Sequence, residues 1–338
     1  MPISWLRRFW TPAHAAAVVA LAALPVLLAS SPYYIFLLNT IAVFAMLALG
    51  LQLVLGYGGV LQLGYAGFFG LGAYTSAILS TQHGWPFPAA FLAAMVVAVA
   101  GAVVMSPIVR LRDVNFAMAT FVFGLILELV YNQWSAMTNG PIGFRGIPAP
   151  RLFGVTVLDP QHYYYLLFAA LLAEYVLIFR LLHSPFGTAL RAMRENETAC
   201  RTSGIDVTRV KVTLLLVSSA IAGAAGSLLA HMNGFISPPT FGWSTSVALL
   251  MMVVLGGVRS LPGALVGAAV IRLVIERTSV LGQHSNIVFG VALVLFMAFL
   301  PTGLAGLAGG ITAKLPRPAW LGPRSVTPGR PQRSRRTA

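Results

Sequence analysis

Residues Ser184–Lys211 read SPFGTALRAMRENETACRTSGIDVTRVK and form the only long charged segment between apolar stretches of the chain. Apolar side chains recur in its first half at the spacing of one helical face, namely Phe186, Ala189, Leu190 and Met193. Charged side chains fall on the other side: Arg191, Arg194, Glu195 and Arg201. Gly204 offers a stop signal for this helix. The spacing fits two structures equally well: an amphipathic helix whose polar face is left for a partner, or a basic loop that only sets membrane topology.

The composition places the chain in a lipid bilayer. Of its 338 residues, 58% are hydrophobic and 9% are charged, whereas soluble domains contain about 25% charged residues. The net charge of +14 would suggest nucleic-acid binding in a soluble protein. Here the basic residues lie between and after apolar spans, where they orient a membrane protein, so we expect membrane lipid and no nucleic acid as partner. The single cysteine, Cys200, excludes an intrachain disulfide.

Ten apolar segments predict membrane helices: residues 15–29, 33–55, 65–80, 89–109, 114–131, 163–182, 210–230, 244–258, 261–277 and 286–305. A crossing helix needs about 20 residues. The segments 65–80, 244–258 and 261–277 are short for that, and we expect some of them to be re-entrant or broken where they line a cavity. The first segment, with its basic start, also resembles a signal peptide. In either case the next span begins outside.

The distribution of basic residues predicts the orientation. With the N-terminus inside, most of the 22 Lys and Arg fall in inside segments, and only Arg145 and Arg151 fall in outside loops, as the positive-inside rule requires. The fold class is therefore an all-α integral membrane protein with about ten transmembrane or partly re-entrant helices, N-in and C-in. We expect a cytoplasmic anchor over 1–14, a transmembrane domain over 15–305 and a disordered Pro/Arg-rich cytoplasmic tail over 306–338. The outside loop 132–162 is rich in Gly and Pro and predicts a shaped loop rather than a domain.

A second informative stretch is Gly56–Tyr74, GYGGVLQLGYAGFFGLGAY. Small residues at short spacing let helix backbones approach closely within a membrane. The same glycines would permit an unwound turn that faces a cavity, so packing and a substrate role both stay open. The glycine candidates for the pathway or for packing are Gly56, Gly59, Gly64, Gly256 and Gly257.

Polar side chains inside predicted spans are costly and mark candidate functional positions. The candidates are Gln52, Gln62, Thr120, Glu128, Glu174 and Arg272. Arg272 and Glu276 stand four residues apart and can pair, which favours a structural role. Glu128 lies close to the predicted outer surface, where it could be merely solvated. Glu174 lies mid-span and is the most suggestive of an intramembrane role.

The sequence contains no motif of an enzyme. It has no phosphate-binding P-loop, its six histidines are scattered without metal-ligand spacing, and it offers no nucleophile motif. We therefore expect no catalytic residue, no metal and no cofactor in this chain.

Three stretches together resemble the LivM-like group of branched-chain amino acid ABC-transporter permeases. They are Gly56–Tyr74, Ser184–Lys211, and the pair Phe235–Pro238 (FISP) with Met252–Val258 (MVVLGGV). The resemblance covers about residues 35–305. Three positions depart from the group: Gln62 stands where Ser is usual, Tyr65 where His is usual, and Leu125 where Glu is frequent. Glu128, one turn later, could substitute for that Glu.

The resemblance implies that Ser184–Lys211 holds a coupling helix that docks on a separate cytoplasmic ATPase. The docking surface would be Arg191, Arg194, Glu195, Glu197, Ala199, Gly204 and Ile205. It also implies ATP bound by the partner subunits, a second related permease chain, an extracytoplasmic solute-binding protein, and a multi-pass location in the inner (plasma) membrane.

The implied function is import of a small polar solute, with branched-chain or other hydrophobic amino acids as first candidates. The wider family includes urea and amide importers, so the solute stays open. The rival hypothesis is a self-contained secondary transporter that uses Glu174 as an ion or proton site.

Overall fold

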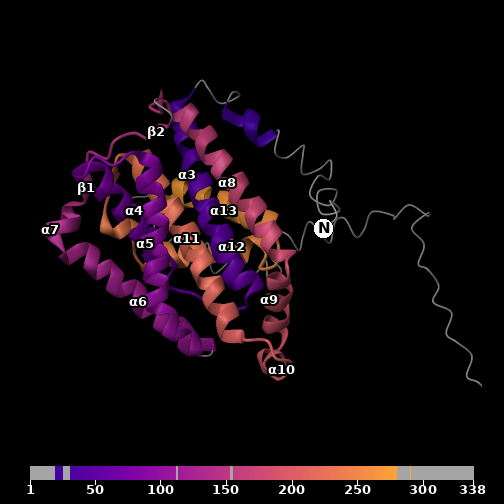
Figure 1. The fold of residues 1–338 in the computed structure, drawn as a ribbon. Helices are drawn as coiled ribbons and strands as arrows, with labels where there is room; N and C mark the ends of the chain where they lie inside the picture. The colour runs from indigo at the N-terminus through magenta and orange to yellow at the C-terminus, as the bar shows by residue number, and fades with distance from the viewer. Residues whose placement is uncertain (1–19, 26–30, 112, 153–154, 280–289, 291–338) are drawn as a thin grey trace, which may run out of the picture.

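The computed structural model describes residues 20–25, 31–111, 113–152, 155–279 and 290. Within that part, six helical stretches are long and apolar enough to cross a membrane: Pro32–Tyr57, Phe87–Arg110, Val114–Gln133, Pro160–Leu182, Val207–Asn233 and Pro238–Gly256. The prediction of an all-α, multi-pass membrane protein is confirmed at this level (Figure 1). The predicted spans 15–29 and 286–305 lie largely outside the described residues, as do the terminal segments 1–14 and 306–338.

The glycine-rich stretch interrupts a helix. The α-helix α3 (Pro32–Leu51) continues into a π-helical turn, η1 (Gln52–Tyr57), and residues 58–64 then leave the helix before α4 (Tyr65–Gln82) begins. The sequence predicted the span 33–55 and the short span 65–80, and both form helices near those bounds. The unwound turn that the glycines permitted is present between them.

Helix α4 is buried among its neighbours, which explains why it lacks an apolar stripe. It packs against α11 (Val207–Asn233), and α11 packs against α5 (Phe87–Met105), which ends in the 3-10 turn η2 (Ser106–Arg110). A Cβ on Gly72 would lie 2.2 Å from the Gly223 carbonyl oxygen. Backbone therefore meets backbone in the centre of the bundle, as expected for small residues in membrane helices.

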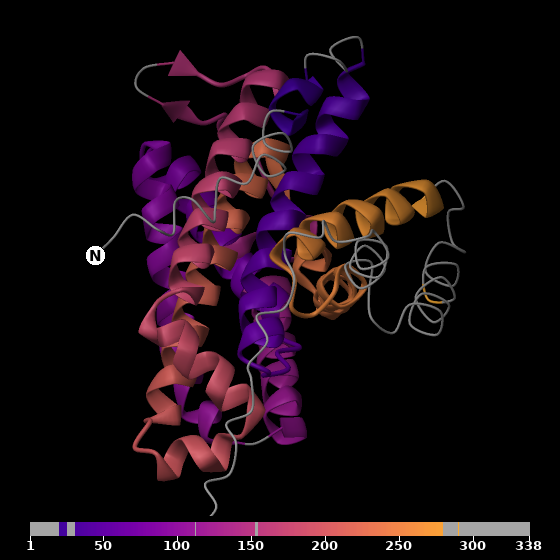
Figure 2. The same ribbon diagram turned by 90° about the vertical axis from the view of Figure 1, so that its right-hand side faces the viewer.

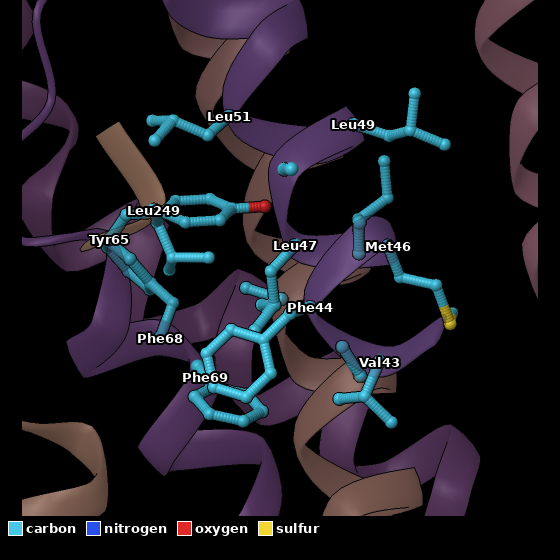
Figure 3. Packing of buried hydrophobic residues seen from close by; sticks show 14 of the residues in the cluster. Val43, Phe44, Met46, Leu47, Leu49, Leu51, Tyr65, Phe68, Phe69 and Leu249 are labelled. Carbon is cyan, nitrogen blue, oxygen red and sulfur yellow. The ribbon is translucent and has the colours of Figure 1, made fainter. Parts of the chain in front are cut away.

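Aromatic side chains fill the space between α3 and α4. The rings of Phe44 and Phe69 meet edge to face with centroids 6.3 Å apart, and Leu47 and Leu249 pack beside them (Figure 3). Tyr65 is fully buried and reaches toward α3 from the first turn of α4.

Helices α6 (Asp113–Gln133) and α8 (Pro160–Leu182) lie at the periphery. Only 22% of the apolar window of each is buried, against 78% for α3 and 72% for α11. Their outward side chains are apolar, for example Val122 and Leu177. This distribution fits helices that face lipid or another membrane chain.

The loop between α6 and α8 has a defined shape, as predicted, and includes short strands that the sequence did not indicate. It contains α7 (Ser135–Thr138), η3 (Gly140–Ile142), β1 (Phe144–Arg145), β2 (Arg151–Leu152) and β3 (Val155–Thr156). Strand β1 pairs antiparallel with β4 (Phe235–Ile236), with Phe144 opposite Ile236. Strand β2 pairs with β3. The loop is thereby tied to the end of α11.

A tight helical hairpin follows the 3-10 turn η4 (Pro238–Phe241). It consists of α12 (Trp243–Gly256) and α13 (Leu261–Ser279). A Cβ on Gly256 would lie 2.2 Å from the Gly263 carbonyl oxygen, and one on Gly267 would lie 2.0 Å from that of Met252. The glycines of this run therefore serve close packing. Arg272 and Glu276 pair as predicted, at 4.0 Å, and the Arg272 guanidinium also lies over the Phe44 ring.

Candidate functional site

The charged segment forms an amphipathic helix, α9 (Pro185–Glu195), at one end of the bundle (Figure 2). Leu190 and Met193 are buried against the helices above it, whereas Arg191 and Glu195 are exposed. The predicted division into an apolar and a polar face is confirmed.

The helix is interrupted at Asn196, so the prediction of one helix running to Gly204 is wrong. Asn196 has extended backbone angles, φ −157 and ψ 101, and its side chain accepts a hydrogen bond from the Ala199 N–H at 3.0 Å. Asparagine is a preferred N-cap because its side-chain oxygen satisfies a free N–H of the first turn. A second helix, α10 (Glu197–Thr202), therefore starts in a new direction.

Gly204 ends α10 by its backbone conformation. Its φ is +82, the Ile205 N–H donates to the Cys200 carbonyl at 3.0 Å, and the Gly204 N–H donates to Arg201 at 3.3 Å. This pattern is a Schellman motif, which glycine favours because it has no Cβ. Gly204 thus shapes the candidate surface.

Glu197 links α10 to α11. Its two carboxylate oxygens accept from Arg201 and Lys211, each at 2.8 Å, and the Lys211 side chain is only 10% exposed. Burial opposes ionisation of Glu197, but the hydrogen bonds from Lys211 and Arg201 outweigh it and lower the pKa of this carboxyl below its ordinary value. Glu197 therefore forms intramolecular ion pairs that join α10 to α11 and is not a free surface charge.

Arg194 also turns inward. Its guanidinium Nη1 donates to the Gly56 carbonyl oxygen, and its methylene groups lie over Gly59, which has φ +68. The seven predicted docking residues therefore divide into two groups. Arg191, Glu195, Ala199 and Gly204 are exposed, whereas Arg194, Glu197 and Ile205 are partly buried.

A cavity of about 600 Å³ adjoins this surface. One wall is the unwound segment, which contributes Gly58 to Leu61 and Leu63, and a second wall is the start of α6. Met193, Arg194, Glu197 and Lys211 complete the lining. The unwound glycine turn therefore faces a cavity at Gly59, while Gly56 and Gly64 pack against backbone at Val258 and Thr120.

The two glutamines near the break differ in their bonding. Gln52 Nε2 donates to the Gly257 carbonyl at 3.1 Å, next to the Gly256 turn. Gln62 is fully buried, and neither its Nε2 nor its Oε1 has a hydrogen-bond partner in the part of the chain that the structure describes. Thr120 Oγ1 accepts from the Leu63 N–H at 3.2 Å and so holds the break from the side of α6.

The remaining candidates occupy separate places. The Tyr65 hydroxyl donates to the Ser218 carbonyl at 3.0 Å. Glu128 accepts from the Trp243 N–H at 3.3 Å at the start of α12, so the interpretation that it is merely solvated is wrong. Glu174 lies in an otherwise apolar cavity of about 710 Å³ between α5 and α8. Both its oxygens are buried without a partner among the described residues.

Sequence reasoning missed three polar contacts inside the bundle. Ser246 Oγ accepts from the Ala66 N–H at 3.0 Å, which joins α12 to the first turn of α4. His231 Nδ1 donates to the Pro148 carbonyl at 2.7 Å, and its Nε2 lies 2.9 Å from Ser76 Oγ. Ser and His in apolar helices were the available signal, but their partners come from distant segments. Across the described ranges, no three His, Cys, Asp or Glu side chains gather as a metal site would require.

Residues 33–300 match the family model described as "Branched-chain amino acid transport system / permease component". The chain belongs to this family. Two LivM proteins, each a high-affinity branched-chain amino acid transport system permease protein, come from Salmonella typhimurium and Escherichia coli K12. Each is 34% identical to this permease over 286 residues, which cover 78% of the permease and 67% of the relative. LivH of Escherichia coli K12 is 24% identical over 287 residues, which cover 78% of the permease and 91% of the relative.

Proposed function

We propose that this permease is the membrane subunit of an ABC importer for a small polar solute, with branched-chain or other hydrophobic amino acids as first candidates. The observation that carries the proposal is the amphipathic pair α9 and α10, which packs its apolar face against the bundle and leaves Arg191 and Glu195 exposed for contact with a cytoplasmic partner. Family membership and the names of the relatives support the solute class. The absence of a P-loop from the sequence supports a separate ATPase.

The assembly that we propose has four kinds of component. Cytoplasmic ATPase subunits bind ATP and contact Arg191, Glu195 and Ala199. A second, related permease chain completes the pathway, and the existence of both LivM and LivH relatives supports this pairing. An extracytoplasmic binding protein delivers the solute. This chain itself holds no cofactor and catalyses no reaction.

The topology that we propose has ten spans in the inner membrane, with both termini in the cytoplasm. Residues 1–14 are the anchor, 15–305 the transmembrane domain and 306–338 the tail. The clustering of basic residues at α9 and α10, and their scarcity in the loop between α6 and α8, support this orientation.

Transport in this proposal is a change of packing. The ATPase moves α9 and α10, and the bundle switches between an outward-open and an inward-open arrangement, because tightly packed interfaces are bistable rather than continuously deformable. The close glycine contacts of α4, α11 and the α12–α13 hairpin supply such interfaces.

The test uses proteoliposomes that hold the assembled system. Labelled leucine should enter on addition of ATP. Excess isoleucine, urea and amides are then added in turn, and the compounds that reduce leucine uptake identify the class of solute. Reversing the exposed charges with Arg191→Glu and Glu195→Lys should release the ATPase. Arg209→Glu is the matched control, because Arg209 is exposed and pairs locally with Asp206. Unchanged ATPase association and uptake in the reversal variant would refute the coupling role.

One observation favours the rival secondary transporter, namely the unpartnered carboxyl of Glu174. Vesicles that hold this chain alone separate the two proposals. Gradient-driven uptake without ATPase, abolished by Glu174→Gln, would support the rival.

A further inference from the structure

The π-helical turn η1 touches two elements that are remote from each other in sequence. On one side, Gly56 accepts a hydrogen bond from Arg194 of α9. On the other side, Gln52 donates to Gly257 at 3.1 Å, and the Tyr57 hydroxyl donates to the Arg259 carbonyl at 3.1 Å. One six-residue turn therefore bonds both to α9 and to the α12–α13 turn.

These bonds meet a physical need of helix ends. The last carbonyls of a helix lack partners within the helix, and the helix dipole makes that end attractive to cations. Gly56 lies in the last turn of the α3–η1 helix, and its carbonyl accepts a hydrogen bond from the Arg194 guanidinium. Gly257 follows the last residue of α12, and its carbonyl accepts a hydrogen bond from the Gln52 side chain. Each helix end is thus completed by a different element.

Packing makes the link stiff as well as polar. A Cβ on Gly56 would lie 2.3 Å from the Val258 carbonyl oxygen and 2.8 Å from the Gln52 amide nitrogen. Backbone therefore contacts backbone between η1 and the hairpin turn, and the Gln52 side chain fills the adjoining space. Close-packed contacts of this kind transmit displacement rather than absorb it.

The α12–α13 hairpin also contacts α4, on the other side of the unwound segment 58–64. Ser246, in the first turns of α12, accepts from the Ala66 N–H at the start of α4. Helix α12 therefore bonds to η1 near its end and to α4 near its beginning. A shift of η1 that moves α12 would also move α4 relative to α3, which would change the unwound segment 58–64 between them.

We propose that η1 transmits the movement of α9 to the α12–α13 hairpin, with Arg194 and Gln52 as its two positioning residues. Neither residue needs to touch solute or ATPase for this role. π-Helical turns inside α-helices occur often at functional sites, and here the turn lies where two helix ends and the candidate docking helix meet. The inference rests on the proposed function, because it needs a partner that moves α9.

The test measures leucine taken up per ATP hydrolysed in proteoliposomes that hold the whole assembly. Arg194→Ala and Gln52→Leu remove opposite ends of the link and should each lower this ratio about tenfold, the effect of one buried or charge-assisted hydrogen bond. The ATPase should still copurify with both variants, since the exposed residues of α9 are unchanged. Arg209→Ala, which removes an exposed cation with a local partner, should keep the wild-type ratio.

The double variant decides whether the two residues act on one route. If they do, Arg194→Ala combined with Gln52→Leu lowers the ratio no further than either alone. Independent effects would multiply to about a hundredfold and would overturn the proposal, as would an unchanged ratio in both single variants. Failure of the proposed function has a different signature, namely no ATP-dependent leucine uptake by the wild-type assembly.

Discussion

Replacing Gly72 by alanine tests whether backbone contact between α4 and α11 holds the bundle together. A Cβ at position 72 would lie 2.2 Å from the Gly223 oxygen and 2.4 Å from its Cα, whereas ordinary contact begins at 3.4 Å. The obstacle is backbone, so the helices must separate by about 1 Å, and such a gap forfeits roughly a quarter to a half of the dispersion energy of the affected contacts. Overpacking costs about 1–3 kcal/mol, and the better helix propensity of alanine offsets roughly 1 kcal/mol.

We therefore expect Gly72→Ala to lower the free energy of unfolding by up to about 2 kcal/mol. The matched control is Gly101→Ala in α5, where the new Cβ would lie 2.6 Å from Leu71 Cδ1 and at ordinary contact distance, 3.6 and 3.8 Å, from the Phe68 ring. The Leu71 atom ends a flexible side chain that can rotate, so the control should be neutral or slightly stabilised. Unfolding of the purified permease in mixed detergent micelles, by heat and by SDS titration, measures the difference. Equal stability of the two variants would refute the argument from backbone contact.

Three further predictions concern polar and backbone features. Glu174→Leu should raise the unfolding midpoint in detergent, because it removes an unpartnered buried carboxyl that costs about 1–3 kcal/mol. Glu174→Gln should raise the midpoint by less. A lower midpoint in the Leu variant would show that the carboxyl has a partner. Gly204→Ala should strain the left-handed turn by about 1 kcal/mol and speed hydrogen exchange of the Ile205 amide, and unchanged exchange would contradict the Schellman assignment. Because its pKa lies below the ordinary value of 4.5, Glu197 stabilises the α10–α11 contact above that pH and loses this effect as pH falls through the lowered pKa. Amide exchange in α10 should show this acid-induced opening in the wild type, and persistence of the opening in Glu197→Gln would assign it to another group.

The sequence predicted the elements whose pattern is local. Runs of apolar residues indicated the long helices of the described residues within a few residues, and the spacing of Leu190 and Met193 indicated the buried face of α9. The pairing of Arg272 with Glu276 followed from their distance along one helix. Such features need no knowledge of the rest of the chain.

The features that the sequence did not predict depend on partners from afar. The interruption at Asn196 had a local signal, an N-cap residue before an acidic first turn, which a continuous helical period concealed. The π-helical turn had none, because its bonds to Arg194 and Gly257 come from elements far along the chain. For the same reason, the sequence could not divide the seven candidate docking residues into the four that are exposed and the three that are partly buried, because that division depends on tertiary contacts.

The bonds that complete the break between α3 and α4 have a consequence for the order in which the protein is made. Arg194 follows Gly56 by 138 residues, and Gly257 follows Gln52 by 205. When the ribosome has delivered α3 and α4, neither partner has yet been synthesised, so the polar groups at the end of α3 lack these hydrogen bonds at that stage. The break therefore reaches its final form only after the α12–α13 turn has emerged, and the first half of the nascent permease needs either the insertion machinery or interfacial water to shelter it until then.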